Sequence, residues 1–136
     1  MSTNNNKIFC LSCKDAEYVF VFGSNTVGRH GRGAAAHAKQ CHKAKNGIGY
    51  GLQGGSFGIP TKDSKIKTLS LSKIKRNVED FIKFAEEHTK LKFFVTKIGT
   101  GLAGYTDEDI APMFKDAPEN CVLAESWQVI IQRMKG

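Results

Sequence analysis

The feature that most constrains the fold is a short apolar run that leads through a glycine-rich segment into an alanine-rich one. Val19 to Phe22 is apolar throughout, which is typical of a strand buried on both faces. The segment from Gly23 to Arg32 is rich in glycine and polar residues, and a helix is predicted from Gly33 to Lys43. A strand, a tight loop and a helix in this order form the basic unit of α/β proteins.

The first glycine loop, residues 23–33, has the properties of an anion site. Glycine lets the backbone approach a ligand closely, and a helix N-terminus offers unpaired N–H groups and the positive end of a dipole. Its spacing, Gly28-x-x-Gly31-x-Gly33, differs from both the dinucleotide fingerprint and the P-loop. The loop therefore predicts a phosphate cradle, and a tight connection that binds nothing is the alternative.

A second glycine loop follows another strand-like segment, Phe93 to Ile98. Ligands of open α/β sheets bind at the carboxyl ends of strands. We therefore expect the two loops to face each other across one crevice, with Asn25 on its floor, and to hold a diphosphate. The second loop comprises Gly99, Thr100, Gly101, Leu102, Ala103, Gly104 and Tyr105.

The alternation of strands and helices predicts a three-layer α/β/α sandwich with a mixed sheet. A helix is predicted from Ser72 to Thr89 by its apolar period, and another begins at 106–109 with a capping-box-like start. Short strands are expected at 8–11, 56–60 and 121–123, an irregular loop at 47–55, and either a helix or a strand at 126–134. Residues 7–136 are expected to form a single domain after a disordered segment, 1–6.

The composition favours a basic, soluble protein. The net charge is +7, which indicates an anionic partner. Aromatic residues such as Phe81 and Phe93 fall at core-type positions and not among the basic residues, so nucleic-acid binding is the less favoured alternative. No apolar run approaches the roughly 20 residues of a membrane span, and the N-terminus lacks the apolar region of a signal peptide. We expect a cytoplasmic protein without membrane association.

The cysteines invite a metal-site hypothesis. Cys10 and Cys13 form a C-x-x-C pair, while Cys41 and His42 are adjacent, with His37 four residues before Cys41. This arrangement lacks the second pair of the usual zinc sites, and a disulfide is disfavoured in a reducing compartment. No metal and no cofactor are therefore expected, and His37 is expected to be packed or exposed and not catalytic.

Several stretches together resemble a known family, the macrodomains. The chain is most similar to an uncharacterised, largely phage-associated branch that is related to the terminal ADP-ribose glycohydrolase type. The resemblance extends from Val19 to about Leu123. It rests on the stretches Val21–Asn25, Gly28–Ala35, Gly49–Gly54, Ile59–Asp63 and Gly101–Pro112.

The resemblance implies a ligand and a set of ligand-binding residues. Macrodomains bind ADP-ribose, and some hydrolyse ADP-ribosyl linkages or ADP-ribose 1″-phosphate. By position, Asn25 resembles the asparagine that bonds the distal ribose, and Gly31, Gly33 and Ala34 resemble the first diphosphate loop. Residues 99–105 resemble the second diphosphate loop.

Three residues are catalytic candidates. Lys62 resembles a lysine that the glycohydrolase type keeps after its strand, but Ala103 stands where that type has an aspartate. His30 could serve as a base and Asp63 could orient water, because both lie near the expected site. Their alternatives are a backbone hydrogen bond for His30, a solvated charge for Lys62 and a turn cap for Asp63.

Three functions are open at this point. The chain binds ADP-ribose or a related NAD-derived nucleotide diphosphate and hydrolyses it, binds such a ligand or an ADP-ribosylated target without turnover, or is a small basic nucleic-acid-associated protein. The family's adenine-contacting aspartate has no clear counterpart, because Asp15 and Glu17 lie too close to Asn25. If the protein is phage-encoded, its compartment would be the host cytoplasm.

Overall fold

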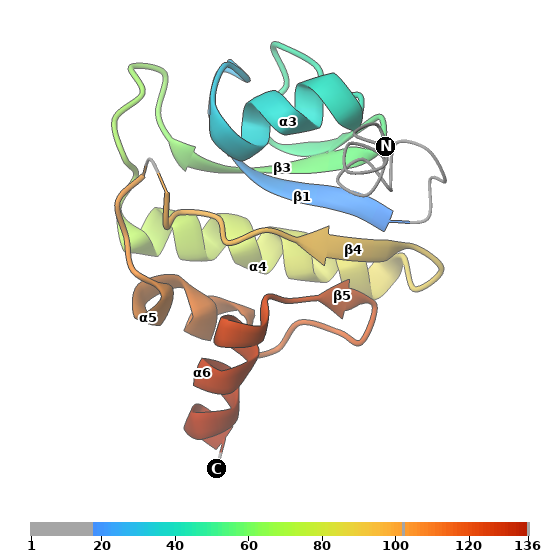
Figure 1. Ribbon diagram of the computed structural model, residues 1–136, viewed down its shortest axis with the longest axis vertical. Coiled ribbons are helices and arrows are strands. Elements are labelled where there is room, and N and C mark those ends of the chain that lie inside the picture. Colours follow the sequence, from blue (N-terminus) through green and yellow to red (C-terminus); the bar gives the residue numbers. More distant parts are fainter. Residues whose placement is uncertain (1–17, 102, 136) are drawn as a thin grey trace, which may run out of the picture.

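The computed structural model describes residues 18–101 and 103–135 (Figure 1). Within this part of the chain, five strands form one mixed sheet in the order β2-β3-β1-β4-β5. β1 lies in the middle, parallel to both β3 and β4; β5 is parallel to β4, and β2 is antiparallel to β3. The strands are β1 Tyr18–Asn25, β2 Gly51–Gln53, β3 Ser56–Lys62, β4 Lys92–Val95 and β5 Cys121–Val122.

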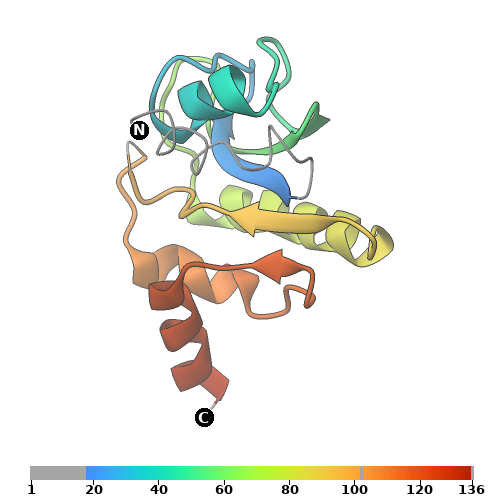
Figure 2. The same cartoon turned by 45° about the vertical axis from the view of Figure 1, so that its right-hand side comes forward.

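Helices cover both faces of this sheet, which gives the expected three layers. Helix α3 (Gly33–Cys41) lies against one face of β1, while α4 (Leu71–Glu87) lies on the other side (Figures 1 and 2). Three further helices lie at the β4–β5 end of the sheet: the short helix α5 (Asp107–Ile110), the 3₁₀-helix η1 (Ala111–Phe114) and α6 (Glu125–Lys135).

Strand β1 faces two separate apolar clusters because successive side chains of a strand point to opposite faces. Val19 and Val21 belong to the larger cluster, together with the buried residues of α4. Phe20 and Phe22 belong to the smaller cluster beneath α3. Burial of a side chain of this size stabilises a fold by about 1.5–3 kcal/mol, so the apolar run predicted from the sequence anchors both layers.

The larger cluster is the main core, and α4 supplies one wall of it. The helix begins after Ser70, whose side chain accepts a hydrogen bond from the backbone N–H of Lys73. Its apolar face buries the residues that the sequence period predicts: Ile74, Val78, Phe81, Ile82 and Ala85. The helix ends at Glu87, two residues before the predicted end.

The structure corrects several predicted boundaries. The segment 47–55 is not wholly irregular, because β2 pairs with β3 within it. β1 continues to Asn25 and β3 to Lys62, so residues expected in loops are strand ends. The segment 126–134, open between helix and strand, lies in α6. The capping box at Thr106 and Asp109 is confirmed, while the strand expected at 8–11 lies outside the described residues.

Among the described residues, no helix is both long and apolar enough to cross a membrane.

Candidate functional site

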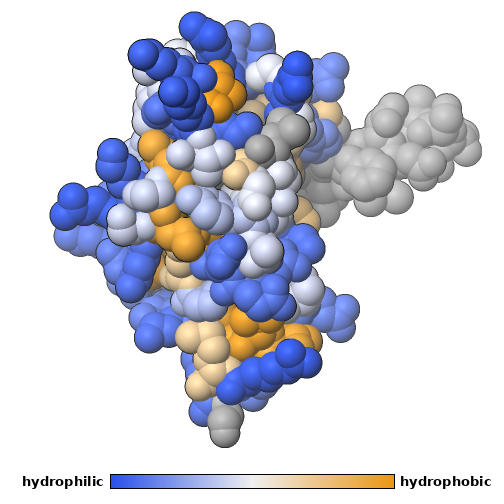
Figure 3. All heavy atoms as spheres, turned by 90° about the vertical axis from the view of Figure 1, so that its left-hand side faces the viewer, coloured by the Kyte–Doolittle hydropathy of each residue, from blue (hydrophilic) through white to orange (hydrophobic). Residues whose placement is uncertain are grey.

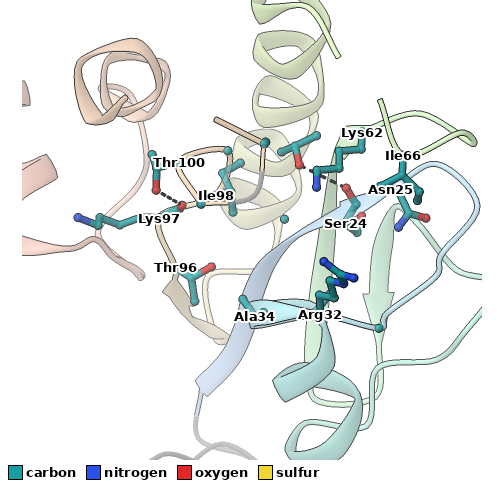
Figure 4. A pocket seen from close by; sticks show the side chains of 18 of the residues that line it. Ser24, Asn25, Arg32, Ala34, Lys62, Ile66, Thr96, Lys97, Ile98 and Thr100 are labelled. Carbon is teal, nitrogen blue, oxygen red and sulfur yellow. Dashed lines mark hydrogen bonds between the residues drawn. The ribbon is translucent and has the colours of Figure 1, made fainter. Parts of the chain in front are cut away.

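A pocket of about 450 Å³ lies where the carboxyl ends of β1, β3 and β4 meet (Figure 4). Both glycine loops line it, which confirms that they border one crevice. Its lining includes Asn25, Gly31, Gly33, Ala34, Lys62, Gly99, Thr100, Gly101 and Ala103. These nine residues are all members of the site expected from the sequence.

The first glycine loop is fixed by the side chain of Asn25. The amide nitrogen of Asn25 donates to the backbone carbonyl of Arg29 at 2.8 Å, and its amide oxygen accepts from the backbone N–H of Arg29 at 2.9 Å. Asn25 lines the pocket but is only 7% exposed. Its amide therefore shapes the loop, a role that the sequence did not indicate.

The loop also packs tightly on the segment before β2, which requires two glycines. A Cβ atom on Gly28 would lie 2.3 Å from the backbone nitrogen of Ile48, and one on Gly49 would lie 2.2 Å from the carbonyl oxygen of Asn25. Real side chains do not fit at such distances. These glycines therefore serve close backbone packing, while Gly31, where a Cβ would meet nothing within 4 Å, faces open space in the pocket.

The second glycine loop is held by its own turn and by a neighbouring loop. The hydroxyl of Thr100 donates to the carbonyl of Lys97 at 2.8 Å, and the backbone N–H of Tyr105 donates to the carbonyl of Gly99. The hydroxyl of Thr68 donates to the carbonyl of Ala103 at 2.9 Å. The loop that carries Thr68 thus lies against the glycine loop across one end of the pocket.

The electrostatics of the pocket favour an anion. Arg29, Arg32, Lys62 and Lys97 line it, and no Asp or Glu does so among the described lining residues. Of these four cations, only Lys97 has a carboxylate partner in the described part of the chain: its ammonium lies 3.3 Å from Asp107. Figure 3 shows the left-hand face of Figure 1, where near-neutral surface and an apolar strip beside it are bordered by hydrophilic side chains.

The structure places His30 away from the pocket and corrects its expected position as a base. His30 is 3% exposed and does not line the pocket. Its Nε2 lies 3.1 Å from both the carbonyl of Ile48 and the side-chain oxygen of Gln53. Because both partners are acceptors, Nε2 carries the proton, and the ring packs edge-on against Phe22. His30 anchors the first loop to the segment before β2.

Asp63 also lies outside the pocket lining, and its geometry is that of a turn cap. Its carboxylate accepts hydrogen bonds from the backbone N–H groups of Lys65 and Lys67 at 2.8 and 3.0 Å. The bond from Lys67 is the main reason that the pKa of Asp63 is lowered. Lys62, in contrast, does line the pocket at the end of β3.

Three residues of the second loop need separate mention. Tyr105 does not line the pocket, because its hydroxyl donates to the carbonyl of Leu69 and its ring packs against the main core. Gly104 is not a lining residue either, and its φ of 88° allows the loop to turn back. Leu102 lies outside the described residues.

Sequence reasoning missed some of the lining residues. Arg29 and Arg32 belong to the first loop, and their charge was a usable signal. Thr96 and Lys97 follow β4 directly, so their position at a strand end could have identified them. Ile66 gave no signal, because nothing in the sequence shows that its loop folds back over the pocket.

The structure also bears on the cysteines. Within the described residues, no group of three His, Cys, Asp or Glu side chains could hold a metal ion. Cys41 is disulfide-bonded, which corrects the expectation of reduced cysteines, while Cys10 and Cys13 lie outside the described residues. Cys121 is a free thiol, and burial raises its pKa to about 12.

Comparison with solved structures identifies the fold. The chain is similar to the macrodomain of Mycobacterium tuberculosis DarG, with a TM-score of 0.57 and 22% identity over 79% of this chain and 89% of that one. The chain has the macrodomain fold. A protein of unknown function from Bacteroides thetaiotaomicron matches with a TM-score of 0.48 and 19% identity over 74% of this chain and 80% of that one. No family model and no curated protein match the sequence.

Proposed function

We propose that this protein binds ADP-ribose or a related NAD-derived nucleotide diphosphate in the pocket between the two glycine loops. The observation that carries the proposal is that both loops flank one pocket whose described lining holds four cations and no carboxylate. A diphosphate is an anion that two backbone cradles can hold together. The macrodomain fold supports the same choice of ligand.

The N-terminus of α3 provides one half of the diphosphate site. Its first intrahelical hydrogen bond among the described residues runs from the N–H of Ala36 to the carbonyl of Arg32, and Arg32 makes no side-chain cap. Within the described part of the chain, the N–H groups of Gly33, Ala34 and Ala35 have no acceptor in the helix, and all three residues line the pocket. Oriented N–H groups at the positive end of a helix bind phosphate oxygens.

Binding without turnover is the form of this function that the site favours. Hydrolysis needs a group that activates water beside the reacting carbon. Neither His30 nor Asp63 lines the pocket, and Ala103 replaces the carboxylate that the glycohydrolase type uses. The protein then acts as a sequestering module for an NAD-derived signal or for an ADP-ribosylated target.

Hydrolysis is the second candidate, and the pocket position of Lys62 favours it. An ammonium without a carboxylate partner, among the described residues, could stabilise charge that develops on a leaving group. Single-turnover assays with ester-linked, base-linked and 1″-phosphorylated ADP-ribose test this directly. Turnover that falls by at least about tenfold in Lys62→Ala, with ADP-ribose affinity within a few-fold, would establish it. No turnover of any of the three substrates by the wild type would exclude it.

The binding proposal is tested by placing a negatively charged side chain in the first glycine loop. Gly31 has space for a side chain, whereas Gly33 has a φ of 57° and would be strained by any substitution. Gly31→Glu should therefore keep the fold and abolish the rise in Tm that ADP-ribose causes in the wild type. Gly31→Ala is the matched control and should retain most of that rise. An unchanged rise in a folded Gly31→Glu would contradict the proposal.

A further inference from the structure

The loop between β3 and α4 holds a side chain in a conformation that its type rarely adopts. Ile66 has a φ of 62°, in the left-handed region, and it lines the pocket. For a β-branched residue this conformation is unfavourable, because Cβ crowds the carbonyl oxygen that follows. Such strain persists only where the surrounding structure enforces it, and it gathers at ligand-binding sites.

Asp63 enforces the conformation of this loop. Its carboxylate accepts from two backbone N–H groups, and its own backbone accepts from Ile66 and donates to Lys67. Beyond the turn, Lys62 and Thr68 form a β-bridge, and Thr68 bonds to the second glycine loop. The turn is closed at both ends, so Ile66 is held in place over the pocket and is not a side chain of a loose surface loop.

Ile66 is the one large apolar side chain among the described lining residues that is open to solvent. It is 42% exposed, while Ile98, which also lines the pocket, is 3% exposed. Figure 4 shows Ile66 on the same side of the pocket as Lys62 and Asn25, which are register partners in the sheet. A group bound there meets an ammonium and a branched apolar surface together.

This combination suits the ring of a sugar better than a purine. The hydroxyl oxygens of a pentose accept hydrogen bonds from an ammonium, and its C–H face packs on an aliphatic side chain. A purine would call for a stacking partner, and the described lining residues include no aromatic ring. We propose that Ile66 determines specificity by packing on the terminal ribose of the bound ligand, with Asp63 positioning it; this rests on the proposed ADP-ribose site.

The test compares ADP-ribose with ADP, which lacks the terminal ribose. Asparagine tolerates the left-handed conformation, so Ile66→Asn removes the apolar surface without adding strain. We expect affinity for ADP-ribose to fall about five- to thirtyfold, affinity for ADP to stay within twofold, and Tm to be unchanged or higher. Titration calorimetry and a thermal melt of the same samples measure all three.

Lys43 provides a matched control. It is the other non-glycine residue with a positive φ in the described part of the chain, 63°, and it does not line the pocket. Lys43→Asn should leave the affinity for both ligands within twofold. If Ile66→Asn does not fold, Ile66→Gly replaces it, because glycine adopts this φ freely.

The possible outcomes of these titrations distinguish a wrong assignment of Ile66 from a wrong proposed function. Equal affinity of wild type and Ile66→Asn for ADP-ribose would overturn the assignment of Ile66, as would an equal loss for ADP and ADP-ribose. A Tm that falls sharply in both Ile66 variants, with binding per folded molecule unchanged, would make Ile66 a structural residue only. A wild type that binds neither ADP-ribose nor ADP would instead overturn the proposed function.

Discussion

At the scale of single residues, two polar side chains of the expected site, Asn25 and His30, form hydrogen bonds that fix the conformation of the first glycine loop. Asn25 forms a pair of hydrogen bonds with the backbone of Arg29, and His30 bonds to Ile48 and Gln53. Both residues are buried. The chemistry of the pocket surface therefore falls to cations and backbone N–H groups, and the polar residues of the loop give that surface its shape.

We predict that His30→Ala acts on stability. The variant loses one buried and one part-buried hydrogen-bond contact and the ring packing on Phe22, so the free energy of unfolding should fall by about 2–3 kcal/mol. Urea unfolding followed by circular dichroism measures this. If His30→Ala is as stable as the wild type but has a much lower turnover, the prediction is wrong and His30 is a catalytic residue.

At the scale of elements, the side chain of Asn120 links the C-terminal end of α4 to the segment before the edge strand β5. The amide of Asn120, just before β5, donates to the carbonyls of Ala85, His88 and Leu91 at 3.0–3.1 Å. Carbonyls at a helix C-terminus have no partners within the helix and need others. Asn120 thus supplies a donor at the C-terminal end of α4, which ends at Glu87 and not at the predicted Thr89.

We predict that Asn120→Ala lowers the free energy of unfolding by about 2 kcal/mol, because the side-chain hydrogen bonds to three carbonyls are lost; the carbonyls of Ala85 and His88 keep their backbone donors. Gln128→Ala is the control. Its amide donates to a single carbonyl, that of Leu123, in an exposed setting, so its loss should cost less than about 0.5 kcal/mol. Equal stability of the two variants in chemical denaturation would contradict the role of Asn120.

At the scale of the whole molecule, the carboxylates of Asp63 and Asp107 make the stability of two distant parts of the fold depend on pH. The pKa of Asp63 is lowered mainly by the backbone N–H of Lys67. The pKa of Asp107 is lowered mainly by the indole N–H of Trp127, which lies 3.1 Å away, and further by Lys97. The first carboxylate fixes the loop over the pocket, and the second joins α5 to α6.

Stability should therefore fall on the acid side. A carboxylate whose pKa is lower in the folded state stabilises the protein fully above its unfolded value of about 3.9 and loses this contribution as the pH falls through the folded pKa. We predict that Asp63→Asn/Asp107→Asn flattens the decrease in Tm between pH 5 and pH 3. Thermal melts followed by the fluorescence of the single tryptophan, Trp127, measure it. An equally steep decrease would contradict the prediction.

The sequence by itself determined most of the order of elements, though not β2 or the helical state of 126–134, and it showed that the two glycine loops border one pocket. The apolar run of β1, the period of α4 and the capping box at Thr106 are local patterns, so short-range physics defines them. Two glycine loops after two strands were enough to predict one shared pocket, because parallel strands end at the same edge of a sheet.

Only the tertiary structure decided which side chains face the pocket. His30 turns away because its partners, Ile48 and Gln53, come from a segment folded against the loop. Ile66 enters the pocket because Asp63 closes the turn and Thr68 reaches the second loop. The local turn at Asp63 is only part of the cause: the direction of these loop side chains also depends on hydrogen bonds to residues distant in sequence, and those partners come together only when the chain is folded.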